Sequence, residues 1–182
     1  MQRLELNHST YTFIRNFKNN PELRNSFNNL AKVTFGLNFE NWYREGFWGD
    51  NYIPYALLYK DKIVSNVSVT KIDFNIENEQ KTGIQIGTVM TDPSYRRLGL
   101  SKFLMEQVIS EWRDKSDFIY LFANNSVLDF YPKFNFGIVE EYQHSISVKP
   151  SGKALSLKKL NPDKKEDRRL LMNTIKTSIP MA

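Results

Sequence analysis

Three stretches between residues 55 and 90 have the apolar pattern of strands, and this pattern limits the fold more than any other feature of the chain. Residues 55–59 are apolar throughout, and the next two stretches place apolar side chains at every second position. The segments between them, residues 60–62 and 75–80, are short and polar. Apolar residues with a period of two, joined by turns this short, are typical of antiparallel strands connected by hairpins. The pattern therefore predicts a three-stranded antiparallel sheet at the centre of the fold.

The second of these strands changes the parity of its apolar positions. They are Val67 and Val69 in its first half, and Ile72 and Phe74 in its second. One face of a strand keeps a constant parity, so we expect a bulge or a bend near residues 70–71.

Segments before and after these strands have apolar residues at helical spacing. This spacing begins at Pro21, recurs more briefly over residues 39–44, and covers residues 100–112. The compact apolar run 118–123 predicts a buried strand that is parallel to a neighbour. In 182 residues this order predicts a mixed α/β (α+β) single domain, with a mostly antiparallel sheet flanked by helices.

The C-terminal third carries weaker patterns. Ser126 begins helical spacing, but Pro132 would fall inside the helix, so a regular helix is not expected through it. A strand is predicted from Phe136 to about Val148, with residues 154–157 as its hairpin partner. The residues around Pro162 predict the start of a helical tail.

The composition excludes several classes of site. There is no cysteine, and the only histidines are His8 and His144. Disulfides, thiol nucleophiles and cysteine-bound zinc are therefore excluded, and we expect no metal. The glycine spacings match neither the P-loop nor the dinucleotide fingerprint. The chain has no apolar signal core and no bilayer-length apolar run, which predicts a cytoplasmic protein without membrane contact.

Positive charge is concentrated at the C-terminus. The net charge is +5, but residues 149–182 hold nine Lys or Arg against three acidic residues. A basic tail can contact nucleic acid or another anionic partner. The near-neutral body argues against nucleic acid, and a solvated helix face explains the tail more simply.

The segment from Thr88 to Ser101 combines features that bind anions. A strand ends in a short turn, Arg96 and Arg97 follow, and Gly99 stands in the first turn of a helix. Backbone N–H groups at a helix start are free to donate, the helix dipole favours negative charge, and glycine lets a phosphate approach. An ordinary turn with solvated arginines would show the same residues.

The spacing of this segment decides between these interpretations. Arg96-x-x-Gly99-x-Ser101, preceded by Asp92-Pro93 and Tyr95, resembles the acetyl-CoA-binding motif of the GNAT superfamily of N-acetyltransferases. The family prefers Gly or Ala where this chain has Ser101. Serine is also small, so contact with the pyrophosphate is expected to be kept.

A second segment, residues 124–136, resembles the other signature of the same family. Asn124, Phe130, Tyr131 and Phe136 fit it. Asn135 replaces the family's glycine, a mild change because asparagine tolerates a left-handed backbone, and a valine replaces its alanine. Both motifs occur in the expected order with a predicted strand between them.

The resemblance implies a fold, a domain division and a reaction. Residues 1–148 would form a GNAT-like acetyltransferase domain, with 1–51 as the variable helical acceptor region and 52–148 as the core sheet and CoA site. Residues 149–182 would add the last strand and the basic helical tail. The enzyme would move an acetyl group from acetyl-CoA directly to a primary amine, without a metal or a covalent intermediate.

The resemblance also assigns roles. Tyr131 would be catalytic and protonate the departing thiolate, although it also falls on an apolar stripe where an aromatic residue normally packs. Donors to the oxyanion would lie near Val89 and Met90. The residues implied in acetyl-CoA binding are Thr88, Val89, Met90, Arg96, Arg97, Leu98, Gly99, Leu100, Ser101 and Asn124.

Two parts of the site stay open at this stage. The strand before the motif, residues 84–90, has no carboxylate to act as general base, and nothing ranks the candidates elsewhere. Residues 39–52 are rich in aromatic side chains, which could wall an acceptor pocket or simply pack on the sheet. The candidate bases are Asp73, Glu140, Glu141 and His144.

The same residues are compatible with other functions and partners. A GNAT-fold protein could bind acyl-CoA without catalysis, as a sensor or pseudoenzyme, and the missing carboxylate and Ser101 motivate this alternative. The tail helix, with an apolar face at Leu170, Leu171 and Ile175, could cover the core, mediate a homodimer or begin a further segment.

Overall fold

The computed structural model describes residues 1–142, 145–147 and 158–177. The chain forms two compact units, Met1–Gly137 and Ile138–Ala182. The first unit contains the sheet, three of the four α-helices given below, and all the residues that the two motifs single out.

The first unit is built on one six-stranded sheet, whose strands lie side by side in chain order. Neighbouring strands are antiparallel, except that β5 and β6 are parallel. The predicted antiparallel sheet and the predicted parallel strand are thus confirmed. The strands are β1 (Gln2–Leu6), β2 (Ser9–Arg15), β3 (Tyr52–Tyr59), β4 (Lys62–Ile76), β5 (Glu79–Thr91) and β6 (Phe118–Leu121).

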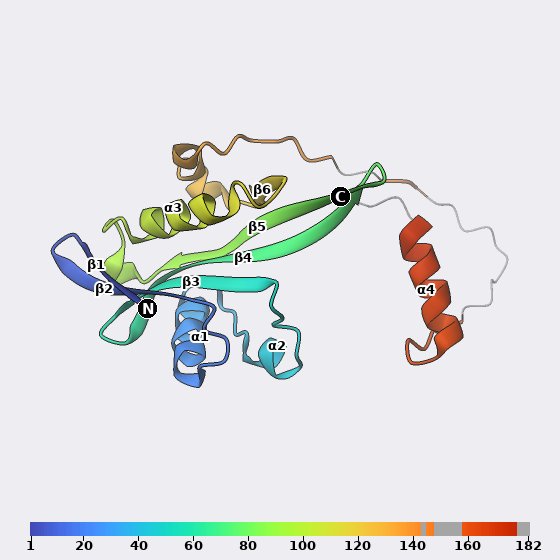
Figure 1. Ribbon diagram of the computed structural model, residues 1–182, viewed down its shortest axis with the longest axis horizontal. Coiled ribbons are helices and arrows are strands. Elements are labelled where there is room, and N and C mark those ends of the chain that lie inside the picture. Colours follow the sequence, from blue (N-terminus) through green and yellow to red (C-terminus); the bar gives the residue numbers. More distant parts are fainter. Residues whose placement is uncertain (143–144, 148–157, 178–182) are drawn as a thin grey trace. The chain divides into compact units, whose positions relative to one another are not determined.

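Helices cover both faces of this sheet (Figure 1): α1 (Pro21–Phe35) and α2 (Glu40–Arg44) lie on one side and α3 (Leu100–Trp112) on the other. All three were predicted from apolar spacing. Each side has its own buried cluster. Under α3 the cluster includes Leu57, Val67 and Leu104, and under α1 it includes Phe27 and Trp48.

The strands β1 and β2 were not predicted, because the sequence placed only helices in the first 51 residues. They form an antiparallel hairpin at the edge of the sheet. Its turn is made by Asn7 and His8, both with left-handed backbone (φ of +46° and +60°). The strands are short, and β1 has one side in water, so their apolar alternation is weak.

The bulge predicted near residues 70–71 is wrong. The pairing of β4 with β5 is regular from Ser68 to Ile76, and the irregularity lies between Asn66 and Ser68. The parity changes for a different reason. Val67 packs under α3, whereas Phe74 packs against Phe118 of β6. The strand therefore stays regular while its apolar side chains move from one face to the other.

The segment after β6 forms two single-turn 3-10 helices, η2 (Asn125–Val127) and η3 (Tyr131–Phe134). No regular helix crosses Pro132, as expected for a residue that lacks a backbone N–H. A third such turn, η1 (Pro93–Tyr95), follows β5.

In the second unit the predicted tail helix is present as α4 (Lys165–Thr177). The strand predicted from Phe136 is not: residues 136–142 and 145–147 have no regular structure. Its remaining residues and the proposed partner 154–157 lie outside the described residues. Nothing in the described part of the chain is a helix of the length and apolar character needed to cross a bilayer.

Candidate active site

The site begins where two strands separate. β5 and β6 pair over only four residues, Gly83–Ile86 with Phe118–Leu121. β5 continues to Thr91, whereas β6 ends at Leu121. Along residues 87–91, β5 has no described strand beside it on this edge, so its backbone groups face an opening.

A pocket of about 580 Å³ occupies this opening. Its walls come from the end of β5, the segment 122–131, the start of α3 and the last turn of α1. Seven of the eleven site residues predicted from the sequence line this pocket together. They are Thr88, Val89, Met90, Arg96, Ser101, Asn124 and Tyr131.

The other four predicted residues, 97–100, do not line the pocket but build the loop beside it. Arg97 and Gly99 have left-handed backbone, with φ of +65° and +74°. The side-chain amide of Asn7 donates to the carbonyl of Leu98. These contacts fix the path by which the chain enters α3.

The start of α3 leaves backbone donors without partners inside the helix. Its N-cap is Gly99, which has no side chain to cap it, and its first backbone bond joins the N–H of Phe103 to the carbonyl of Gly99. The N–H groups of residues 100–102 come before that bond and have no helical acceptor. Ser101 is tied to the end of β5, because its hydroxyl lies 2.6 Å from that of Thr91.

Thr88 has an unusual backbone for a β-branched residue, with a φ of +50°. The side-chain amide nitrogen of Asn66, on β4, donates to the carbonyl of Thr88 at 3.0 Å. The hydroxyl of Tyr52, on β3, lies 2.7 Å from the hydroxyl of Thr88. Two neighbouring strands thus hold the strained position that faces the pocket. The sequence motifs contain neither Asn66 nor Tyr52. Tyr52 ends the aromatic-rich stretch 39–52, but no local pattern marks the contact of either residue with Thr88.

Tyr131 enters the pocket from η3, where its ring packs against Phe130 and Phe136. Burial raises the pKa of the Tyr131 hydroxyl above its usual value. The phenol is therefore protonated at neutral pH and can donate a proton.

The pocket carries little charge. Of the described residues that line it, Arg96 is the one charged side chain, and none is acidic or a histidine. Among the candidate bases, Asp73 on β4 accepts from the hydroxyl of Thr82. Glu140 and Glu141 belong to the second unit, and His144 lies outside the described residues.

The aromatic residues between 39 and 52 pack as core, except Phe47, which is exposed. Trp48 and Tyr52 expose 3% and 8% of their surface, and the ring of Trp42 contacts both. None of them lines the pocket. Of the two interpretations of this cluster, the structure supports packing on the sheet, and only the hydroxyl of Tyr52 reaches the site, through Thr88.

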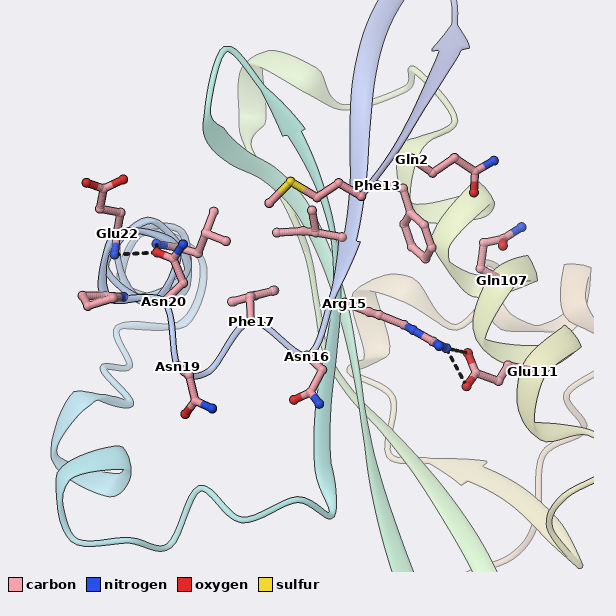
Figure 2. A pocket seen from close by; sticks show the side chains of 14 residues that line it. Gln2, Phe13, Arg15, Asn16, Phe17, Asn19, Asn20, Glu22, Gln107 and Glu111 are labelled. Atoms are coloured by element: carbon pink, nitrogen blue, oxygen red, sulfur yellow. Dashed lines mark hydrogen bonds and ion pairs between the residues drawn. The ribbon is translucent and has the colours of Figure 1, made fainter.

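A larger hollow of about 1150 Å³ lies elsewhere in the first unit, beside β2 and between the start of α1 and the side of α3. Figure 2 shows Arg15 and Glu111 pointing toward each other across it, joined at 2.7 and 2.9 Å. The two charges neutralise each other, and none of the predicted site residues lies there. The described residues include no group of three His, Cys, Asp or Glu side chains suited to a metal.

Several solved structures with this fold are acetyltransferases, all of low sequence identity to this chain. An acetyltransferase from Trypanosoma brucei is 20% identical, over 76% of this chain and 99% of that chain, with a TM-score of 0.58. Glucosamine-6-phosphate N-acetyltransferase from Arabidopsis thaliana is 18% identical, over 78% and 100%, with a TM-score of 0.59. A predicted acetyltransferase from Clostridium acetobutylicum, solved with acetyl-CoA, is 14% identical over 75% and 96%, with a TM-score of 0.60.

The sequence itself matches a family profile. Residues 20–139 match that of the acetyltransferase (GNAT) domain. This range is more than half of the chain. It contains the pocket, both motifs and four of the six strands, because β1 and β2 end before residue 20. The chain therefore belongs to the GNAT family of acetyltransferases.

Proposed function

We propose that this protein is an N-acetyltransferase that moves an acetyl group from acetyl-CoA directly to the amine of an acceptor. One observation carries the proposal: the strained backbone at Thr88, the uncapped start of α3 and the hydroxyl-bearing Tyr131 meet around a single pocket. A solved relative of the same fold contains acetyl-CoA.

The residues at the start of α3 fit a donor that carries phosphates. The N–H groups of residues 100–102 have no helical acceptor, and Arg96 adds a positive charge beside them. A Cβ built on Gly99 would meet no atom nearer than the Asn7 side-chain nitrogen at 4.0 Å, so the backbone there is open to a ligand. These groups would hold the pyrophosphate of CoA.

The bound donor supplies a thioester, whose carbonyl carbon accepts the amine and whose sulfur departs. The backbone at Val89 and Met90, beside the strained Thr88, would stabilise negative charge on the thioester oxygen. Tyr131 would give its proton to the sulfur, and its raised pKa keeps the phenol protonated until the thiolate departs.

A second function is favoured by one observation, the absence of any acidic or histidine side chain among the described residues of the pocket. A protein that binds acyl-CoA without catalysis, as a sensor, needs no base. The two functions share the donor site and differ in turnover.

Release of CoA from acetyl-CoA in the presence of amines tests the proposal. The chain has no cysteine, so a thiol reagent detects CoA without a background from the protein. Amine-dependent release supports the acetyltransferase. Binding of acetyl-CoA without release, for alkyl and aromatic amines alike, would support the sensor instead.

A further inference from the structure

We infer that the acceptor is an uncharged aromatic amine rather than an alkylammonium or a polycation. The inference rests on the proposed function and names the acceptor class of the same pocket. It comes from the charge of the pocket and from the aromatic side chains that lead out of it.

An alkylamine meets an electrostatic obstacle here. With a pKa near ~10.4, only about one molecule in a thousand is neutral at pH 7.4. The charged form loses solvation on entering the pocket, and the described lining offers it no carboxylate, only the like charge of Arg96. To become the neutral nucleophile, a bound ammonium must give its proton to a base, and no acidic or histidine side chain is present in the described lining.

An aromatic amine avoids both obstacles. Its nitrogen lone pair is delocalised into the ring, so the amine is already neutral at physiological pH and enters without a counterion. It also needs no base before it attacks. The absence of a carboxylate or histidine from the described lining therefore favours aromatic amines over alkylamines.

Part of the pocket lining is apolar. It includes Phe35 at the end of α1, and Phe122, Val127 and Phe130 after β6. Phe35 and Phe122 expose 40% and 69% of their surface, which is high for rings with no polar group. An aromatic ligand would cover these faces.

Phe122 also begins an aromatic row that continues along β6 and onto β4. Its ring lies 5.9 Å from that of Tyr120, which lies 5.8 Å from that of Phe118, and Phe118 lies 5.3 Å from Phe74. Gly83 makes this row possible, because a Cβ there would come within 2.6 Å of both Phe118 and Phe74. The row extends the apolar wall away from the pocket and fits an acceptor with more than one ring.

The reaction balances without a further reactant. The nitrogen lone pair forms the new N–C bond, and the C–S bond breaks with its electron pair on sulfur. The sulfur takes a proton from Tyr131, and the nitrogen loses one proton, which restores the tyrosine through water. The products are an N-acetylated aromatic amine and CoA.

A matched pair of amines tests the inference on the full chain. Aniline and cyclohexylamine have similar size, but only cyclohexylamine is protonated at pH 7.4. We expect kcat/KM for aniline to exceed that for cyclohexylamine by about tenfold or more, and 2-aminonaphthalene to exceed aniline. The aniline rate should be flat between pH 6.5 and 8.5, whereas the cyclohexylamine rate should climb about tenfold per pH unit.

Two variants, each with a control variant, test whether the pocket itself sets the preference for aromatic amines. Thr34→Glu places a carboxylate at the pocket from α1 and should raise the cyclohexylamine rate about tenfold relative to aniline. Asn29→Glu adds the same charge on the same helix, outside the pocket, and should change neither the cyclohexylamine rate nor the aniline rate. Phe122→Ala should raise KM for 2-aminonaphthalene about tenfold, whereas Phe47→Ala, at a ring that is also exposed (64%), should not.

Release of CoA and thermal stabilisation by acetyl-CoA together separate the two possible failures. If cyclohexylamine is acetylated as fast as aniline or faster, the acceptor class is wrong while the proposed function stands. If no amine releases CoA, the proposed function itself fails, and thermal stabilisation by acetyl-CoA then shows whether the donor site stands.

Discussion

The buried side-chain amide of Asn66 donates a hydrogen bond of 3.0 Å to the backbone carbonyl of Thr88, a residue 22 positions away. Asn66 has no exposed surface, and its other donor contact is with the hydroxyl of Ser68 at 2.9 Å. Thr88 has a φ of +50°, which a β-branched residue rarely adopts. A buried amide on β4 therefore fixes the backbone that faces the pocket on β5.

This contact predicts that Asn66→Ala impairs catalysis more than donor binding. The loss of a buried hydrogen bond should lower the free energy of unfolding by about 1–3 kcal/mol, and kcat should fall about tenfold or more because the backbone near Val89 relaxes. Asn28→Ala is the matched control. Its side chain is also buried and accepts from the N–H of Phe39, far from the pocket lining. An equal loss of kcat in both variants would mean that Asn66 acts on stability alone.

Removal of the phenol hydroxyl tests the proton donor. Tyr131→Phe should lower kcat about 100-fold, because general acid catalysis contributes roughly 10²–10⁴-fold, while binding of acetyl-CoA is kept. Tyr59→Phe removes a hydroxyl from a partly buried ring that packs on Tyr11 and Tyr95, so kcat should not change. Steady-state rates and thermal shifts check both variants. Full activity in Tyr131→Phe would leave the tyrosine a packing role only.

The close packing over Gly83 predicts a cost for a single methyl group. A Cβ there would lie 2.6 Å from carbons of Phe74 and Phe118, so Gly83→Ala should lower the unfolding free energy by about 1–3 kcal/mol. Gly49 has no atom within 4 Å of its Cβ position, and Gly49→Ala should stay within about 0.5 kcal/mol of the wild type. Urea denaturation measures both. Equal stability of the two variants would contradict the packing described here.

The raised pKa of Tyr55 predicts that the protein loses stability at alkaline pH. The Tyr55 hydroxyl accepts from the indole N–H of Trp112 at 2.9 Å, and burial raises its pKa to about 12. The unfolded chain, with a tyrosine pKa near ~10, releases this proton first as the pH rises. The stabilising contribution is therefore complete below pH ~10 and is lost between about 10 and 12.

A titration that stops at pH 11 covers only part of this interval, so we expect a loss on the order of 1 kcal/mol there. Urea denaturation between pH 8 and 11 should show a steeper decline in wild type than in Tyr55→Phe, which cannot release the proton. Parallel curves would show that Tyr55 does not titrate differently in the folded protein.

Apolar periodicity predicted most of the fold. The spacing over residues 21–35 and 100–112, the apolar run in β3 and the alternation in β4 and β5 were enough to place these elements. The hairpin of β1 and β2 was not found, because its strands are short and its turn residues, Asn7 and His8, form no strong turn motif. Local signals are strong where a long face is buried and weak at a sheet edge.

Local sequence motifs predicted residues that line the pocket, but not the residues that support it from neighbouring strands. The motif residues cluster because they lie on one strand end and on the segments that directly follow two strands, so the fold brings them together. Asn66 and Tyr52 could not be predicted, because their contacts with Thr88 depend on the register of three strands. The bulge expected near residues 70–71 was misplaced because parity in the sequence does not reveal which face is covered.

The central claim is that the loop before α3 binds acetyl-CoA, and a thermal shift with paired glycine variants tests it most directly. Gly99 and Gly46 both have left-handed backbone, with φ of +74° and +80°, so Glu at either position should cost about 1 kcal/mol or more of stability. Only Gly99→Glu places a carboxylate where the pyrophosphate would bind.

With acetyl-CoA at about 100 times its Kd, the gain of roughly 2.7 kcal/mol should raise the Tm of the wild type by about 5–10 °C. We predict the same rise in Gly46→Glu and none in folded Gly99→Glu. No rise in the folded wild type, or an undiminished rise in Gly99→Glu, would contradict the account.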